Sequence, residues 1–162
     1  MNTRFAPESE IDKSTVLGAK PFKHIEKIID NVLPHAERGI IARGEIIHYC
    51  SGDTRQCFLL LHGSVALHRR GDGIVLNSES APFILGVSSQ LSSEHLYVRA
   101  LETSEVASVS LARFNHVVAQ QNLWEHFSNL LIYTASRVYE HCAQISQMSA
   151  YDIIRFQLVE LM

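Results

Sequence analysis

The sequence has few of the residues that mark several large classes of protein. It holds three cysteines, Cys50, Cys57 and Cys142, which form neither a C-x-x-C pair nor the even-numbered set of a disulfide scaffold. No apolar run approaches the ~20 residues that a membrane helix needs, and the N-terminus lacks the apolar stretch of a signal peptide. These absences predict a cytoplasmic protein that functions in a reducing environment and away from the membrane.

Basic charge is also scarce. Fourteen Lys and Arg residues face seventeen Asp and Glu residues, which gives a formal net charge of -3. A domain that grips nucleic-acid phosphates usually has a clear basic excess. These residues by themselves are therefore expected to bind nucleic acid poorly.

Sequence motifs of enzymes are missing too. There is no G-x-S-x-G elbow, no P-loop and no G-x-G-x-x-G, so we predict no catalytic residue and no enzyme. His48, His62 and His68 lie in a strand-like region and leave open a cupin-like metal enzyme as an alternative. Because no His-x-His pair with a Glu at ligand spacing accompanies them, we expect no metal site and no cofactor.

Glycine and proline are confined to one part of the chain. All eight glycines and all four prolines lie at or before Gly86, so the composition changes partway along. Residues 1–20 are mostly polar and unpatterned, which predicts a flexible tail. Pro21 is suited to the first turn of a short amphipathic helix that Pro34 ends. The apolar residues of that helix are Phe22, Ile25, Ile28, Ile29 and Val32.

Short strands are expected in the region that follows. Residues 40–85 contain the apolar runs GEIIHYC, CFLLLHGSVALHRR and IVLNSESAPFILG, which turn signals separate, and residues 96–101 and 106–111 add two more. This spacing is typical of a β-roll, barrel or sandwich. Gly63 joins two such runs, a position that often requires a positive φ. With helices on either side, residues 21–121 are predicted to form one domain of the α+β class.

A long helix is predicted over residues 122–148. Its length would be roughly 40 Å, which is more than a small β-domain needs to cover one face. Apolar and small polar residues follow a three-four alternation along it, as in a coiled coil. We expect this seam to form a homodimer; the alternative is a helix that is buried wholly inside its own domain. The seam residues are Trp124, Phe127, Leu131, Thr134, Val138, His141, Ile145 and Met148.

The cysteines suggest one further hypothesis. Cys50 and Cys57 are placed to face each other across a hairpin, so reversible oxidation of this pair is worth testing by thiol counting. Cys142 lies beside the helix seam and is interpreted as a small core residue.

The order of these elements resembles the CRP/FNR (cAMP receptor protein) family of bacterial transcription regulators. The similar segments are FLLLHGSVALHRR, PFILG and YVRALETSEVASVSLARFNHVV, and the resemblance covers roughly residues 22 to 162. Within the family, the chain resembles the enterobacterial IprA/YaiV-like group, in which an APFI-G segment also follows the strand pair. The resemblance implies a double-stranded β-roll, which is the jelly-roll-like cyclic-nucleotide-binding-domain fold, as an effector domain with flanking helices. It also implies that residues 122–148 form the dimerisation helix.

The ligand segment departs from the pattern of this family. Cyclic-nucleotide binders carry Gly-Glu where this chain has Gly86-Val87, and Arg-Ser near the place where it has Glu94-His95. Val87 offers no charge-assisted hydrogen bond, and a carboxylate would repel a phosphate. Arg99 is either a substitute or a structural residue of the next strand. We therefore predict that cAMP does not bind in the usual way, and that the pocket either accepts another small molecule or is filled by side chains.

The final segment, AYDIIRFQLVELM, predicts a helix that stops without a capping residue. In the resembled family this helix begins the winged helix-turn-helix domain, so residues 149–162 are expected to start a C-terminal DNA-binding domain that continues elsewhere. The chain is thus predicted to be the effector and dimerisation part of a transcription regulator that contacts DNA through that further domain. The alternative is a stand-alone β-roll sensor or adaptor. The identity of an effector, the target genes and an activating or repressing role are not indicated by the sequence.

Overall fold

The computed structural model describes residues 19–91, 93–146 and 150–161. Within these residues, antiparallel strands lie between an α-helix that precedes them and three α-helices that follow, which confirms the predicted α+β class. Residues 1–18 of the expected tail and Met148 of the expected seam lie outside the described residues. In chain order the elements are α2 (Phe22–Val32), η1 (Leu33–His35), β1 (Glu37–Ile41), β2 (Ile46–Ile47), β3 (Cys50–Ser51), β4 (Thr54–His62), β5 (Ser64–Arg69), β6 (Val75–Ser80), β7 (Phe83–Leu85), η2 (Ser93–His95), β8 (Leu96–Ala100), β9 (Ser104–Ser110), α3 (Leu111–Gln120), α4 (Trp124–Ser146) and α5 (Ala150–Glu160).

The strands form two antiparallel sheets that enclose the core. One sheet has the order β1-β9-β4-β3, with β7 also paired to β4, and the other has the order β2-β8-β5-β6. Gly63 connects β4 in the first sheet to β5 in the second and has a φ of 100°. A Cβ atom there would lie 2.1 Å from the hydroxyl oxygen of Ser104, so the expectation of a positive φ is confirmed and close packing adds a second reason for glycine.

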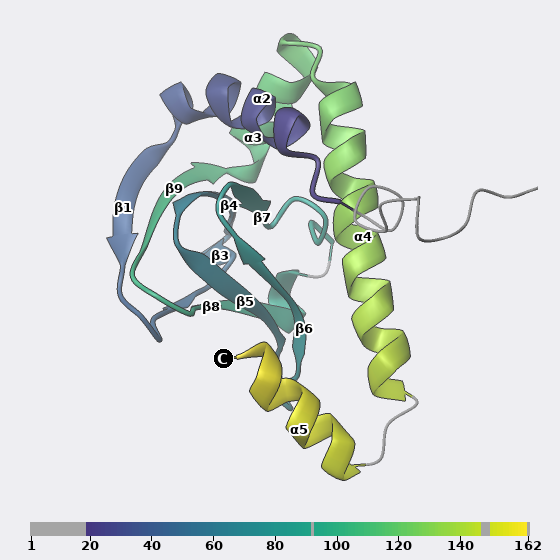
Figure 1. Cartoon of the computed structure of the whole chain (residues 1–162). Helices are drawn as coiled ribbons and strands as arrows, with labels where there is room; N and C mark the ends of the chain where they lie inside the picture. The colour runs from purple at the N-terminus through teal and green to yellow at the C-terminus, as the bar shows by residue number, and fades with distance from the viewer. Residues whose placement is uncertain (1–18, 92, 147–149, 162) are drawn as a thin grey trace, which may run out of the picture.

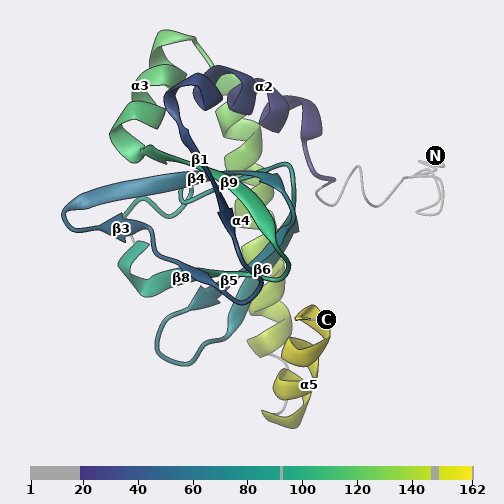
Figure 2. The same cartoon turned by 90° about the vertical axis from the view of Figure 1, so that its left-hand side faces the viewer.

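Three helices cover the roll. Figure 1 shows α2 and α3 at one end of the sheets and α4 running alongside them toward the opposite end, and Figure 2 shows the same arrangement from the side. Four of the five apolar residues expected in the first helix, Ile25, Ile28, Ile29 and Val32, are buried. The long helix begins at Trp124, because Asn122 has a φ of 54° and cannot continue a right-handed helix. Among the described helices, none combines the length and apolar character that crossing a bilayer requires.

The apolar stripe on α4 lies against its own domain. Phe127, Thr134 and His141 are buried within the single chain, and Leu131, Val138 and Ile145 are half-buried. Trp124 is 51% exposed. The expected dimer seam is therefore largely an intramolecular contact. Periodicity selects the face of a helix that is buried, but it does not tell which surface covers that face.

The last helix, α5, folds back onto the edge of the second sheet (Figure 1). The side-chain carboxamide of Gln157 accepts a hydrogen bond from the backbone N–H of Val75 and donates one to the backbone oxygen of Val75 at 3.3 Å. The Ser78 hydroxyl donates to Glu160 at 2.9 Å. Since β6 is an edge strand, Gln157 pairs backbone groups that a neighbouring strand would otherwise take.

Candidate functional site

The five predicted pocket residues do not come together in the structure. Gly86 lines a cavity next to α4 and has a φ of 91°, and Val87 is buried in the core. Glu94 and His95 are exposed on η2, where a carboxylate oxygen of Glu94 lies 3.9 Å from the guanidinium of Arg55. Arg99 lies in β8 and does not line the cavity. Of these five residues, Gly86 is the one that lines the cavity.

The cavity lies between the second sheet, β7 and α4, and its volume is about 20 Å³. That is roughly the space of one water molecule, whereas a ligand of nucleotide size needs a cleft on the order of a few hundred cubic ångströms. Side chains occupy the space instead. The lining residues are Tyr49, Val65, Leu67, Asn77, Glu79, Phe83, Ile84, Leu85, Gly86, Ser88, Ser89 and Thr134.

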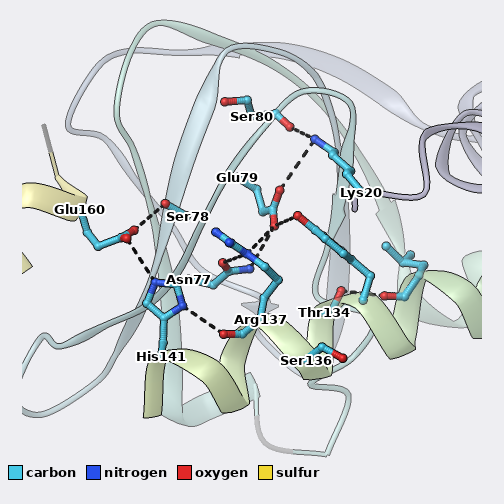
Figure 3. Close-up of polar contacts among 12 residues, drawn as sticks. Lys20, Asn77, Ser78, Glu79, Ser80, Thr134, Ser136, Arg137, His141 and Glu160 are labelled. Atoms are coloured by element: carbon cyan, nitrogen blue, oxygen red, sulfur yellow. Dashed lines mark hydrogen bonds and ion pairs between the residues drawn. The ribbon is translucent and has the colours of Figure 1, made fainter. Parts of the chain in front are cut away.

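A buried carboxylate, Glu79, is the centre of the polar contacts at this cavity (Figure 3). Its Oε1 atom accepts hydrogen bonds from the Tyr133 hydroxyl at 2.8 Å and from the Asn77 side-chain amide at 3.3 Å. The Nε atom of Arg137 lies 3.7 Å from the same oxygen and donates to the side-chain oxygen of Asn77 at 3.3 Å. A carboxylate that is removed from water needs such partners. Glu79, Asn77, Tyr133 and Arg137 therefore join β6 to α4 as one unit, the Glu79 cluster.

The second carboxylate oxygen of Glu79, Oε2, faces the ammonium group of Lys20 at 3.7 Å. Burial lowers the pKa of Lys20, and the charge and hydrogen bonding of Glu79 oppose that change. The pKa of Tyr133 is raised above its usual value, first by burial and then by the Glu79 carboxylate. Both directions follow from placing these groups in a poorly hydrated interior around one negative charge.

Sequence reasoning missed these residues, although a signal was present. The strand expected over Val75 to Ser80 places Val75, Asn77 and Glu79 on one face, and that face is buried. Two polar residues on the inner face of a strand indicate a partnered polar site rather than ordinary core. Tyr133 and Arg137 are four residues apart, so they share one face of α4.

The proposed redox pair requires a correction. In the β3–β4 hairpin Cys50 lies opposite Arg55, and Cys57 pairs with Val109 of β9, so the two cysteines are not cross-strand partners. Cys57 is fully buried, its thiol donates to the backbone oxygen of Val109 at 3.6 Å, and burial raises its pKa to about 12. Because the thiolate is the reactive form, Cys57 is poorly suited to redox exchange. Cys142 is exposed rather than a core residue.

In the part of the chain that the structure describes, no three His, Cys, Asp or Glu side chains come together in a way that could hold a metal ion. Of the three strand-region histidines, only His68 is buried, where it stacks on Tyr97 with ring centroids 4.9 Å apart. Among the described residues, His48, His62 and His68 therefore do not form the set of metal ligands that a cupin-like enzyme would need.

Comparison with solved structures identifies the fold. The chain is similar to the CO-dependent transcription factor CooA from Carboxydothermus hydrogenoformans, with a TM-score of 0.57, 14% identity and coverage of 81% of this chain and 54% of that one. For the c-di-GMP responsive regulator CLP from Xanthomonas campestris the TM-score is 0.58 and the identity 14%, with coverage of 78% of this chain and 67% of that one. For the catabolite activator protein of Thermus thermophilus the TM-score is 0.54 and the identity 19%, with coverage of 80% of this chain and 60% of that one. The chain therefore has the cyclic-nucleotide-binding β-roll fold of CRP/FNR-type regulators, and it spans about half the length of the CooA chain.

Comparisons based on sequence add no closer relative. No family model matches the chain, and no curated protein matches it either.

The chain is also similar to the heme domain of CooA from Rhodospirillum rubrum, with a TM-score of 0.60, 16% identity and coverage of 76% of this chain and 92% of that one. This similarity raises the question of whether the chain could hold haem. The cavity of this chain is lined by no His, Cys or Met side chain, and at about 20 Å³ it is far smaller than a haem. Its one phenol, Tyr49, is buried, and burial raises the pKa of that phenol and so disfavours the phenolate that would bind iron. These residues do not fit a haem group.

Proposed function

We propose that this chain is the effector-type and dimerising part of a CRP/FNR-type transcription regulator that does not bind cAMP in the usual way. The observation that carries the proposal is the Glu79 cluster, which fills the space between β6 and α4 at the cavity that Gly86, a predicted pocket residue, also lines. The side chains of the cluster already occupy that place, and their contacts join the roll to the long helix. The roll and α4 are thereby coupled without any nucleotide.

Calorimetric titration tests the cAMP part of the proposal. We expect no saturable heat when cAMP is added to the chain at micromolar to millimolar concentration. The Glu79→Gln variant is the matched comparison, because it removes the charge and keeps the shape. Saturable micromolar binding by the wild-type protein would overturn the proposal.

The proposed homodimer contact is the exposed face of α4, which we call the outer stripe. Ile132 is 66% exposed and Tyr139 is 73% exposed on this face. They alternate at three-four spacing with residues that are small or polar and carry no formal charge, namely Ser128, Ala135, Cys142 and Ser146. An uncharged stripe on a long helix is self-complementary, so a second copy of the same stripe fits it across a two-fold axis.

Sedimentation velocity tests the outer stripe. We expect a dimer for the wild-type chain and a monomer for the Ile132→Glu, Tyr139→Glu double variant, since two charges per chain would then meet at the axis. The control is Lys27→Glu on the exposed side of α2, which changes charge without touching α4. A monomeric wild-type chain, or a double variant that still dimerises, would contradict this contact.

DNA recognition is assigned to the portion of the regulator that this chain does not span. The net charge of -3 supports this assignment. Fluorescence anisotropy with a labelled duplex near physiological salt is expected to show no binding by these 162 residues and binding by a longer chain that includes a winged helix-turn-helix. Tight DNA binding by the present chain would contradict the assignment.

One observation favours the adaptor alternative. Tyr151, Ile154, Leu158 and Val159 are exposed on α5, and the apolar side of the helix that includes Ile154 and Leu158 lines a groove with the β5–β6 turn. In a stand-alone adaptor this side would contact a protein partner instead of continuing into a DNA-binding domain. The anisotropy experiment on the longer chain distinguishes the two functions. The narrower similarity to the IprA/YaiV-like group is part of the proposal and rests on the APFI-G segment alone.

A further inference from the structure

The side chain of Lys20 enters the roll from the segment before α2 and lies beside the Glu79 cluster (Figure 3). Its side chain is 11% exposed, which is low for a lysine. The ammonium group contacts Glu79 Oε2 at 3.7 Å and donates to the backbone oxygen of Ser80. It also lies 5.3 Å from the ring centroid of Phe22 and 5.6 Å from that of Phe83. We call these four groups around the ammonium the cage.

The chemistry of the cage selects one kind of guest. A carboxylate and a carbonyl accept hydrogen bonds from the three N–H donors of an ammonium group, and two aromatic faces attract a cation through their quadrupoles. None of the four groups is a hydrogen-bond donor that would suit an anion. The cage therefore favours a primary ammonium over a neutral or negatively charged group.

The two oxygens of Glu79 have separate partners, so the cage does not depend on Lys20 to exist. Tyr133, Asn77 and Arg137 all contact Oε1, while Lys20 contacts Oε2. If Lys20 withdrew, Oε1 would keep its contacts and its nearby cation, and Oε2 would remain in place facing an empty cage. Glu79 and Phe83 also line the cavity of about 20 Å³ beside α4, so a guest in the cage is next to the contact between the roll and the long helix.

We propose that the cage is a binding site for a primary ammonium group, that Lys20 fills it from within the same chain, and that a small primary amine takes the place of Lys20 when that side chain leaves. This proposal assigns primary amines as the chemical class of effector for the β-roll, and in that respect it rests on the proposed function. Its test uses neither cAMP, DNA nor dimerisation, so the two proposals fail independently.

Chemical rescue is the direct test. The Lys20→Ala variant lacks a propylammonium fragment, and n-propylammonium chloride is the probe that replaces it. We expect the variant to unfold a few degrees below the wild-type protein, and millimolar propylammonium to restore most of the difference in melting temperature. The wild-type melting temperature should change much less, because Lys20 already fills the cage. Sodium chloride at equal ionic strength and n-propanol are the reference solutes.

Two further variants define the specificity. Lys20→Met keeps an apolar chain in the cage and removes the charge, so propylammonium should give it little or no rescue. Lys23→Ala, on the exposed side of α2, is the matched control and should show neither the loss nor the rescue. The proposal is overturned if Lys20→Ala melts like the wild-type protein. It is equally overturned if propanol or sodium chloride restores the melting temperature as well as propylammonium does.

Discussion

The two faces of β6 both carry polar side chains that contact a helix, but they do so in different surroundings. On the inner face Glu79 is buried and contacts α4 through Tyr133 and Arg137. On the outer side Ser78 contacts Glu160 of α5, a helix with no buried residue. Removing a partner inside leaves a charge without water, whereas water replaces a lost partner outside. The inner contact should therefore hold the fold, and the outer one should be easy to release.

The largest effect is expected for Glu79→Ala. This change leaves the Lys20 ammonium and the Arg137 guanidinium without their carboxylate, and a loss of about 3 kcal/mol in the free energy of unfolding follows from an interior charge that is left unpaired. Urea unfolding measures it. The outer counterpart, Ser78→Ala, removes only the hydroxyl that donates to Glu160 and should change that free energy by about 0.5 kcal/mol. Equal losses for the two variants would remove the distinction between the two faces.

The next effect is expected for Tyr133→Phe, which takes one hydrogen bond from the buried carboxylate and costs about 2 kcal/mol near pH 7. The pKa of the Tyr133 phenol is raised in the folded protein, mainly by burial. Its contribution is therefore present below the unfolded value of about 10 and is lost as the pH rises through the folded value. Urea unfolding at pH 8 and above pH 10 should show a smaller difference between variant and wild type at the higher pH. A difference that grows with pH would contradict the assignment.

A smaller effect is expected for Gln157→Ala at the outer contact. The N–H and C=O groups of Val75 would lose their side-chain partner and bond to water, so the global free energy of unfolding should change by about 1 kcal/mol or less. Amide hydrogen exchange at Val75 should nevertheless become faster, since the edge of β6 is then open. Gln144→Ala, at an exposed position on α4, is the matched control. Unchanged exchange at Val75 would show that α5 does not protect the strand edge.

The three cysteine thiols should differ in reactivity without any change in the stability of the protein. Cys57 is buried and its pKa is raised to about 12, whereas Cys50 and Cys142 are exposed. A thiol reagent at pH 8 should therefore modify Cys50 and Cys142 in the native protein and Cys57 only after unfolding. Mass spectrometry of labelled peptides gives the site of each modification. Rapid labelling of Cys57 in the native protein would contradict this prediction and would support the hypothesis of a redox pair with Cys50.

The sequence by itself determined the fold class and most elements of this protein. Apolar spacing located the helix that contains Ile25 and Ile29, the strands on either side of Gly63, and the long helix that begins at Trp124. These features are local, because a helix or strand shows its buried face at a fixed interval along the chain. The similarity of FLLLHGSVALHRR and its neighbours to a known family then indicated the roll that the two sheets form.

Only the tertiary structure decided which surfaces meet. The stripe through Phe127 and Thr134 was expected to face a second chain, and other parts of the same domain, the helix α3 among them, cover it instead. The ligand residues expected at Glu94 and Arg99 do not line the cavity, while Lys20, Glu79 and Arg137, far apart along the chain, come together. Contacts between distant segments depend on how the sheets close and where α4 lies, and a period of two or of 3.6 residues carries no information about either.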